Sequence, residues 1–250
     1  MSVFAEIWAI LEPFFTGETF LLRRAVKVDK TGLWVLGGII TLVGGYGVHS
    51  LYRLSPFLER NLERTVMILA YLSMALIVCV AVLRRFVFGL IEEAGRLGEL
   101  NFIMQPFYGV LKAYPLGWSQ SIPPLMFLVL AWFACSYNVG TRSHLAFSEF
   151  RLRLSRGGQF LCLSLDAVLW ILFAWVLVVT SSIVVFGTNI ANETTVDGTD
   201  FKLPLWYFNI AVPLSFIFLS GRAMRTWATD LRRYRNDEEL VGTFKMGGED

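Results

Sequence analysis

Long intervals without charged residues constrain this chain more than any other feature. A helix needs about 20 apolar residues to cross the roughly 30 Å hydrocarbon layer of a membrane, and a charge at its centre costs about 2.5–3.5 kcal/mol on insertion scales. Five intervals meet this requirement: residues 31–52, 65–83, a span within 119–141, 157–187 with Asp166 as its single charge, and 203–221. Their continuous apolar character predicts helices and not the alternating strands of a barrel. The sequence therefore predicts an all-α, polytopic membrane protein with about five transmembrane helices.

Composition agrees with a membrane protein and excludes several other classes. With glycine counted in place of tyrosine, the apolar share rises from 55% to about 60%, against roughly 45–50% in soluble domains. The net charge is only +2, and the arginines are scattered, so no nucleic-acid partner is expected. Cys79, Cys135 and Cys162 lie in apolar stretches without a CxxC motif, which predicts free thiols buried in lipid.

The sequence offers little catalytic chemistry. His49 and His144 are the two histidines, and they lie near the ends of different apolar blocks without metal-ligand spacing. The GxSxG, P-loop and GxGxxG motifs are absent, which argues against hydrolase, ATPase and dinucleotide-binding functions. We expect no enzyme, no catalytic residue, no metal and no cofactor.

Positive charges indicate the orientation, because loops rich in Lys and Arg stay in the cytoplasm. Arginines are concentrated in the C-terminal tail and in residues 142–156, whereas Lys202 is the single basic residue within residues 188–202. This places the C-terminus in the cytoplasm and, with five spans, the N-terminus in the periplasm. Four basic residues within residues 1–30 would instead favour a cytoplasmic N-terminus. We favour the periplasmic placement and leave the cytoplasmic one open.

Two segments favour the membrane surface. Within residues 3–15, apolar side chains repeat at helical spacing on one face, which predicts an amphipathic helix lying on membrane lipids. Residues 91–117 mix acidic and apolar side chains. They predict either a second surface helix, broken near Pro106, or an ordinary exposed loop.

Two features inside the spans invite a functional interpretation. Asp166 is an ionisable residue within a span, which makes it a functional candidate; we favour a hydrogen-bonded structural carboxylate over an ion or proton site. Gly37, Thr41 and Gly45 follow a small-xxx-small spacing that lets two helices approach closely. The second helix belongs either to a partner or to this chain.

A series of short motifs from Glu63 onward resembles a known family. In chain order they are Leu62-Glu63, Arg85-Phe86-Val87-Phe88-Gly89, Trp118-Ser119, Gly140-Thr141-Arg142-Ser143-His144-Leu145, Leu203-Pro204-Leu205-Trp206 and Val212-Pro213-Leu214, with Arg222 closing the last helix. Their order resembles the DctQ-like small membrane subunit of tripartite ATP-independent periplasmic (TRAP) transporters. Gln120-Ser121 stands where the family usually has an acidic pair.

The resemblance divides the chain into three parts. Residues 1–60 hold an extra amphipathic segment and an extra transmembrane helix, residues 61–235 form the four-helix family-like region with an insertion near 90–117, and residues 236–250 form a cytoplasmic tail. It also implies two partners, a large membrane subunit that carries the substrate and sodium sites and a periplasmic substrate-binding protein. The small subunit braces the large one during uptake of a small organic acid or related solute across the inner membrane.

Five residues are candidates for subunit contacts or structural roles. By position in the family-like pattern, Arg85, Trp118 and Trp206 lie on the outer side and His144 on the inner side, and Asp166 joins them as the charge inside a span. Two other classes of function remain open. One is a membrane anchor of another complex, and the other is a stand-alone multi-pass enzyme or channel.

Overall fold

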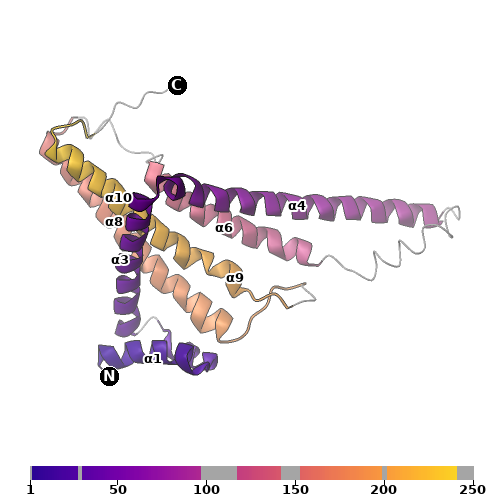
Figure 1. Cartoon of the computed structure of the whole chain (residues 1–250). Helices are drawn as coiled ribbons and strands as arrows, with labels where there is room; N and C mark the ends of the chain where they lie inside the picture. The colour runs from indigo at the N-terminus through magenta and orange to yellow at the C-terminus, as the bar shows by residue number, and fades with distance from the viewer. Residues whose placement is uncertain (1, 28–29, 97–116, 142–152, 199–201, 241–250) are drawn as a thin grey trace, which may run out of the picture.

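The computed structural model describes residues 2–27, 30–96, 117–141, 153–198 and 202–240. These residues form helices and one isolated β-bridge between Thr195 and Pro204. The helices long and apolar enough to span a membrane are α3 Thr31–Leu54, α4 Pro56–Arg96, α6 Trp118–Thr141, α8 Arg156–Ser182 and α10 Ala211–Arg235. The π-helix η2 Ile183–Ile190 extends α8, and α9 Trp206–Asn209 precedes α10. The predicted all-α, polytopic fold with five spans is confirmed (Figure 1).

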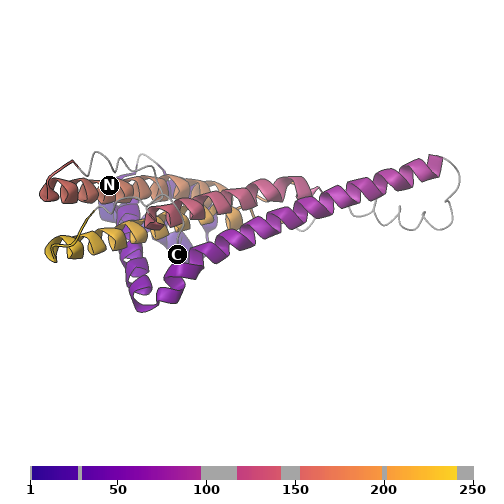
Figure 2. The same cartoon turned by 90° about the horizontal axis from the view of Figure 1, so that it is seen from above.

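Helix α4 is much longer than the charge-free interval 65–83 within it. It has 41 residues, so at 1.5 Å per residue it measures about 60 Å, twice the hydrocarbon thickness of a membrane. Ser55 alone separates it from α3, and Pro56 suits the first helical position because it has no N–H to leave unpaired. Figure 2 shows its far end extending beyond the other helices. Residues 91–96 of the predicted surface segment continue α4, and residues 97–116, with Pro106, lie outside the described residues.

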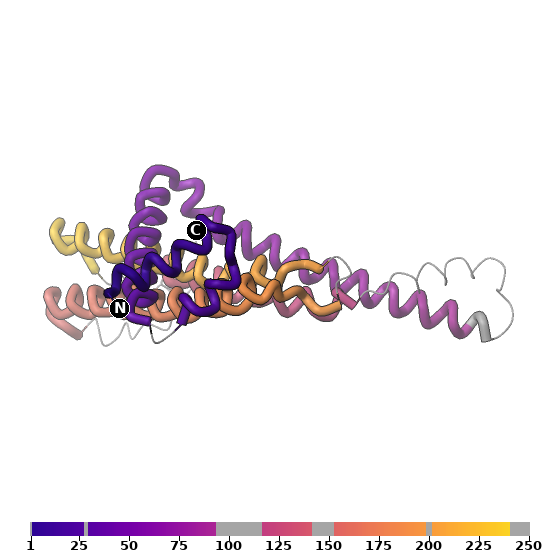
Figure 3. The backbone as a smooth tube through the Cα atoms, turned by 90° about the horizontal axis from the view of Figure 1, so that it is seen from below, coloured from indigo at the N-terminus to yellow at the C-terminus, as the bar shows by residue number. Residues whose placement is uncertain are grey.

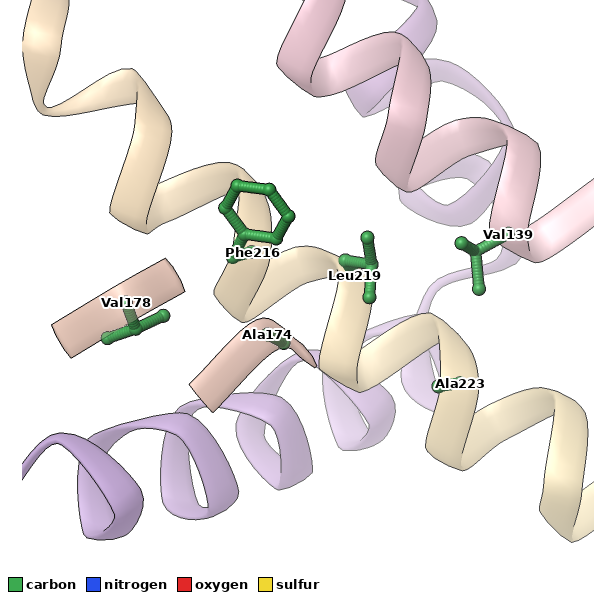
Figure 4. Close-up of a cluster of buried hydrophobic side chains, with 6 residues drawn as sticks. All are labelled: Val139, Ala174, Val178, Phe216, Leu219 and Ala223. Atoms are coloured by element: carbon green, nitrogen blue, oxygen red, sulfur yellow. The ribbon is translucent and has the colours of Figure 1, made fainter. Parts of the chain in front are cut away.

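Helix α10 is the centre of the bundle. It packs against α3, α6 and α8, and 56% of its span is buried, against 6% for α4. A core cluster joins α10 to α6 and α8 (Figure 4). It contains Val139 of α6, Ala174 and Val178 of α8, and Phe216, Leu219 and Ala223 of α10. The peripheral α4 instead keeps most of its apolar surface uncovered.

The small residues of α3 serve contacts within the chain. All three predicted positions are buried: Gly37, Thr41 and Gly45. The hydroxyl of Ser220 on α10 donates to the carbonyl of Thr41 at 3.1 Å. A Cβ added at Gly221 would lie 2.6 Å from the Cβ of Val48, so the α3 and α10 backbones meet closely. Of the two alternatives for the small-residue spacing, the structure shows the helix–helix contact inside the chain.

The predicted N-terminal helix is present as α1 Val3–Thr16, followed by η1 Thr19–Leu21 and α2 Leu22–Ala25. It lies across the start of α3, away from the C-terminal end of α10 (Figures 1 and 3). The carboxylate of Glu6 accepts a hydrogen bond from the backbone N–H of Gly32 at 2.7 Å, which satisfies a free donor in the first turn of α3. The ring of Phe14 contacts that of Phe186 in η2 with centroids 5.5 Å apart. Helix α1 and the π-helix η2 therefore lie at the same end of the bundle.

Candidate functional site

A fully buried carboxylate joins four helices at the end of the bundle where α3 meets α4. Glu63 of α4 is 0% exposed. Its Oε1 accepts hydrogen bonds from the hydroxyls of Ser136 on α6 at 2.9 Å and Tyr52 on α3 at 3.1 Å. Its Oε2 lies 3.1 Å from Nε and 3.0 Å from Nη2 of Arg222 on α10. One side chain thus contacts three neighbouring helices.

The guanidinium of Arg222 is held from several directions. It lies 4.5 Å above the ring centre of Tyr52, a cation–π contact, and its Nη2 also donates to the backbone carbonyl of Glu59. A Cβ at Gly140 of α6 would lie 2.7 Å from Cδ of Arg222, so glycine leaves the room that this side chain occupies. One turn further along α10, Arg225 forms a bidentate pair with the Glu59 carboxylate.

We call Glu59, Glu63, Arg222 and Arg225, with Tyr52 and Ser136, the buried charge cluster. Its inner pair, Glu63 and Arg222, is buried, and its outer pair, Glu59 and Arg225, is partly exposed. Glu59 and Glu63 are four residues apart and Arg222 and Arg225 are three apart, so each pair lies on one face of its helix. Removing one partner of a buried pair leaves an uncompensated charge and costs about 3–5 kcal/mol. Since both Glu63 oxygens already have partners, the Glu63–Arg222 pair is suited to holding helices together.

Three of the predicted contact residues lie on α4, α6 and α9. Arg85 is exposed on α4 and lines a cavity of about 520 Å³ with Gly117 and Ser119, which precede and follow Trp118. Trp118 packs against the core cluster that contains Ile122, Val196 and Phe208. Trp206 stacks on Tyr207 with ring centroids 4.2 Å apart. The structure brings Trp118 close to α9, because Phe208 of α9 belongs to the same cluster.

Asp166 lies on α8, apart from the helices that carry these three residues. Asp166 is partly buried on α8 and has an interaction partner, and His144 lies outside the described residues. Near Asp166, the indole N–H of Trp227 on α10 donates to the hydroxyl of Ser164 at 3.2 Å. Among the described residues, no group of three His, Cys, Asp or Glu side chains is placed to hold a metal ion. The four described candidates, Arg85, Trp118, Asp166 and Trp206, therefore do not form a single site.

The sequence matches the family model of the DctQ component of tripartite ATP-independent periplasmic transporters over residues 74–233, more than half of the chain. The chain belongs to the DctQ family. The match runs from the middle of α4 to the end of α10 and confirms the resemblance seen in the motifs. No curated protein and no solved structure matches the chain significantly.

Membership in the DctQ family fixes the general role of the chain. The family is a transporter component and not an enzyme family, and it implies association with a large membrane subunit and a binding protein. Together with the five spanning helices, it indicates a multi-pass inner-membrane protein. Arg222 and Arg225 fall inside the matched range, whereas Tyr52, Glu59 and Glu63 precede it.

The buried charge cluster was not predicted from the sequence, because charged residues there indicate the ends of the spans and the orientation and are taken to be solvated. A usable signal was present in the spacing. Two acidic residues one turn apart precede the second span, and two arginines one turn apart follow the last span, both on the side predicted to be cytoplasmic. Matching charge pairs at the same end of two helices favour an ion-pair cluster between those helices.

Proposed function

We propose that this DctQ component braces the large membrane subunit in the bilayer and helps to dock the periplasmic binding protein. The assembled transporter would use an ion gradient, with sodium as the proposed coupling ion, to take up a small organic acid or related solute. Family membership supports the subunit role. The buried charge cluster supports a rigid bracing function, since it fixes the ends of four helices to one another.

The observation that carries the proposal is an uncovered apolar stripe on α4. Leu69, Leu76, Leu83 and Leu90 repeat every seven residues, and each is more than half exposed. Val80 and Val87 fill two of the three intervening positions of the heptad, and Ser73 occupies the first. A seven-residue apolar repeat keeps one face of a helix turned toward a second helix in a left-handed crossing. We define these six apolar residues as the α4 stripe and propose that it receives a helix of the large subunit.

The position of the α4 stripe fits this role. At 100° per residue it is centred more than 100° around α4 from the half-buried Ala81 and Phe88, which line the cavity shared with the start of α6. The stripe therefore faces away from the rest of the bundle. We propose that Arg85, Trp118 and Trp206 contribute contacts at the outer side, that His144 does so at the inner side, and that Asp166 is structural.

Co-purification with the large subunit tests the α4 stripe. The double variant Leu76→Ala with Leu83→Ala should reduce retention of the large subunit about tenfold, equivalent to about 1.4 kcal/mol. The matched control makes the same change at Leu165 and Leu169, which are equally exposed on α8. Equal retention by both double variants would contradict the assignment of the stripe.

Reconstituted uptake tests the division of labour. Vesicles containing the large subunit, the binding protein and this chain should accumulate solute when an ion gradient is imposed, and the chain alone should not. Alanine at Arg85, Trp118 or His144 should lower association or uptake more than membrane insertion. Solute transport by the isolated chain would instead favour a stand-alone carrier or channel.

A further inference from the structure

A cavity with charges of both signs lies between the N-terminal helices, outside the residues matched by the family model. Its volume is about 250 Å³. Its polar lining consists of two carboxylates and two cations, Glu6, Glu12, Arg24 and Lys30, and its apolar lining consists of Ala9, Leu21 and Ala25. The family-based function gives this cavity no role.

Among the residues that the structure describes, none of the four charged side chains has an ionic partner. The Glu6 carboxylate accepts a hydrogen bond from the backbone N–H of Gly32. Within the described part of the chain, Glu12, Arg24 and Lys30 form no ion pair. Opposite charges that surround a cavity without neutralising one another are complementary to a ligand that itself carries both an anionic and a cationic group.

The surroundings of the cavity place it at the level of lipid headgroups. Helix α1 lies across the end of α3 (Figure 1), and its outward face carries Phe4, Trp8 and Phe15, which are 80%, 57% and 79% exposed. Aromatic side chains on a helix that crosses the end of a span are typical of the membrane interface. Glu12 follows these aromatic residues around the helix at 100° per residue, between them and the cavity residues Ala9 and Glu6. The charged cavity therefore adjoins a surface suited to acyl chains.

We propose that this cavity binds the headgroup of a zwitterionic phospholipid that carries a primary ammonium group, such as phosphatidylethanolamine. Arg24 and Lys30 bind the phosphate, because cationic side chains make charge-assisted hydrogen bonds to phosphate oxygens. Glu12 binds the ammonium group, and the acyl chains lie along the aromatic face of α1. The bound lipid would fasten α1 to the end of α3. The site is independent of the solute and of the α4 stripe.

Lipid binding to the full chain in detergent, measured by native mass spectrometry, tests the site. Wild-type protein should bind phosphatidylethanolamine at least about tenfold more tightly than phosphatidylglycerol, which has the phosphate but no ammonium group. Glu12→Gln should abolish this preference, and Arg24→Ala or Lys30→Ala should weaken the binding of both lipids. Arg23→Ala is the matched control, because Arg23 is exposed on the same short helix but does not line the cavity.

Three outcomes would overturn the proposal. The first is equal affinity of the wild-type protein for the two lipids. The second is binding by Arg24→Ala and Lys30→Ala that equals binding by Arg23→Ala. The third is displacement of the lipid by inorganic phosphate alone, which would show a simple anion site without a role for the ammonium group or the acyl chains. Elution of each variant at the wild-type volume in size-exclusion chromatography verifies that the changes affect the site and not folding.

Discussion

Replacing Arg222 with methionine should severely destabilise the bundle. The variant keeps side-chain volume but removes two contacts of 3.0–3.1 Å to Glu63 and the cation–π contact with Tyr52. Glu63, which is completely buried, would retain only the two hydroxyl donors. Breaking a buried ion pair from one side costs about 3–5 kcal/mol. For a chain of this size this corresponds to a loss of roughly 6–20 °C in melting temperature.

The opposite single change should cost less. In Glu63→Gln the amide oxygen still accepts from Tyr52 and Ser136, and Arg222 keeps the backbone carbonyl of Glu59 and, at 3.7 Å, its carboxylate. The double variant Glu63→Gln with Arg222→Met should be more stable than Arg222→Met alone, because no buried charge is left without its partner.

Thermal unfolding in detergent, followed by size-exclusion chromatography of the heated samples, measures all three variants. Arg156→Met is the control, because Arg156 is more than one-third exposed and pairs with the exposed Asp237; exposed pairs contribute about 0–1 kcal/mol. Its other contacts, with the last carbonyls of α10 and the ring of Tyr234, are also at the surface. A melting temperature of Arg222→Met equal to that of the control would refute the reasoning, as would a double variant no more stable than Arg222→Met.

Three further predictions address the helix contacts and the termini. Gly221→Leu should destabilise the protein by about 1–3 kcal/mol in thermal unfolding, because any side chain there meets α3, whereas Gly47→Leu, with nothing within 4 Å, should not. Glu6→Ala should cost about 1 kcal/mol by uncapping α3 and should speed proteolysis within α1; an unchanged cleavage rate would contradict the capping role. With the native cysteines replaced, Ser2→Cys and Glu238→Cys should react with a membrane-impermeant maleimide from opposite sides, and labelling of both from one side would contradict the predicted topology.

The fold was predictable where a single physical requirement acts on the sequence. Continuous apolar runs must be buried in lipid or protein, so the five spans could be located from the positions of these runs in the sequence. The helix of residues 3–16 could be predicted from its helical spacing of aromatic and aliphatic side chains. The small residues of α3 indicated a close helix contact, although the sequence did not reveal that Ser220 and Gly221 of α10 complete it.

The remainder depends on contacts between distant segments. Charges delimit a span but do not stop a helix, so the sequence did not predict that α4 continues through Arg84 and Arg85 to Arg96. The pairing of Glu63 with Arg222 joins residues 159 positions apart, and the matching one-turn spacing of two acidic residues and two arginines indicates such a cluster without specifying which residues pair. When charged residues are taken to mark the ends of the spans, each one is assumed to be solvated. Glu63 and Arg222 do not meet this assumption, because they are buried and paired.

The close fit of α3 into the bundle has a consequence for how this protein can be dissected. Although the family match begins only at residue 74, the preceding part is not a removable appendage. A shortened chain that starts after residue 60 would lack the Tyr52 hydroxyl that donates to Glu63, and would expose Ser220 and Gly221 of α10 to lipid. Attempts to isolate a minimal unit should therefore retain the first sixty residues, and chimaeras that replace them should exchange the facing side of α10 as well.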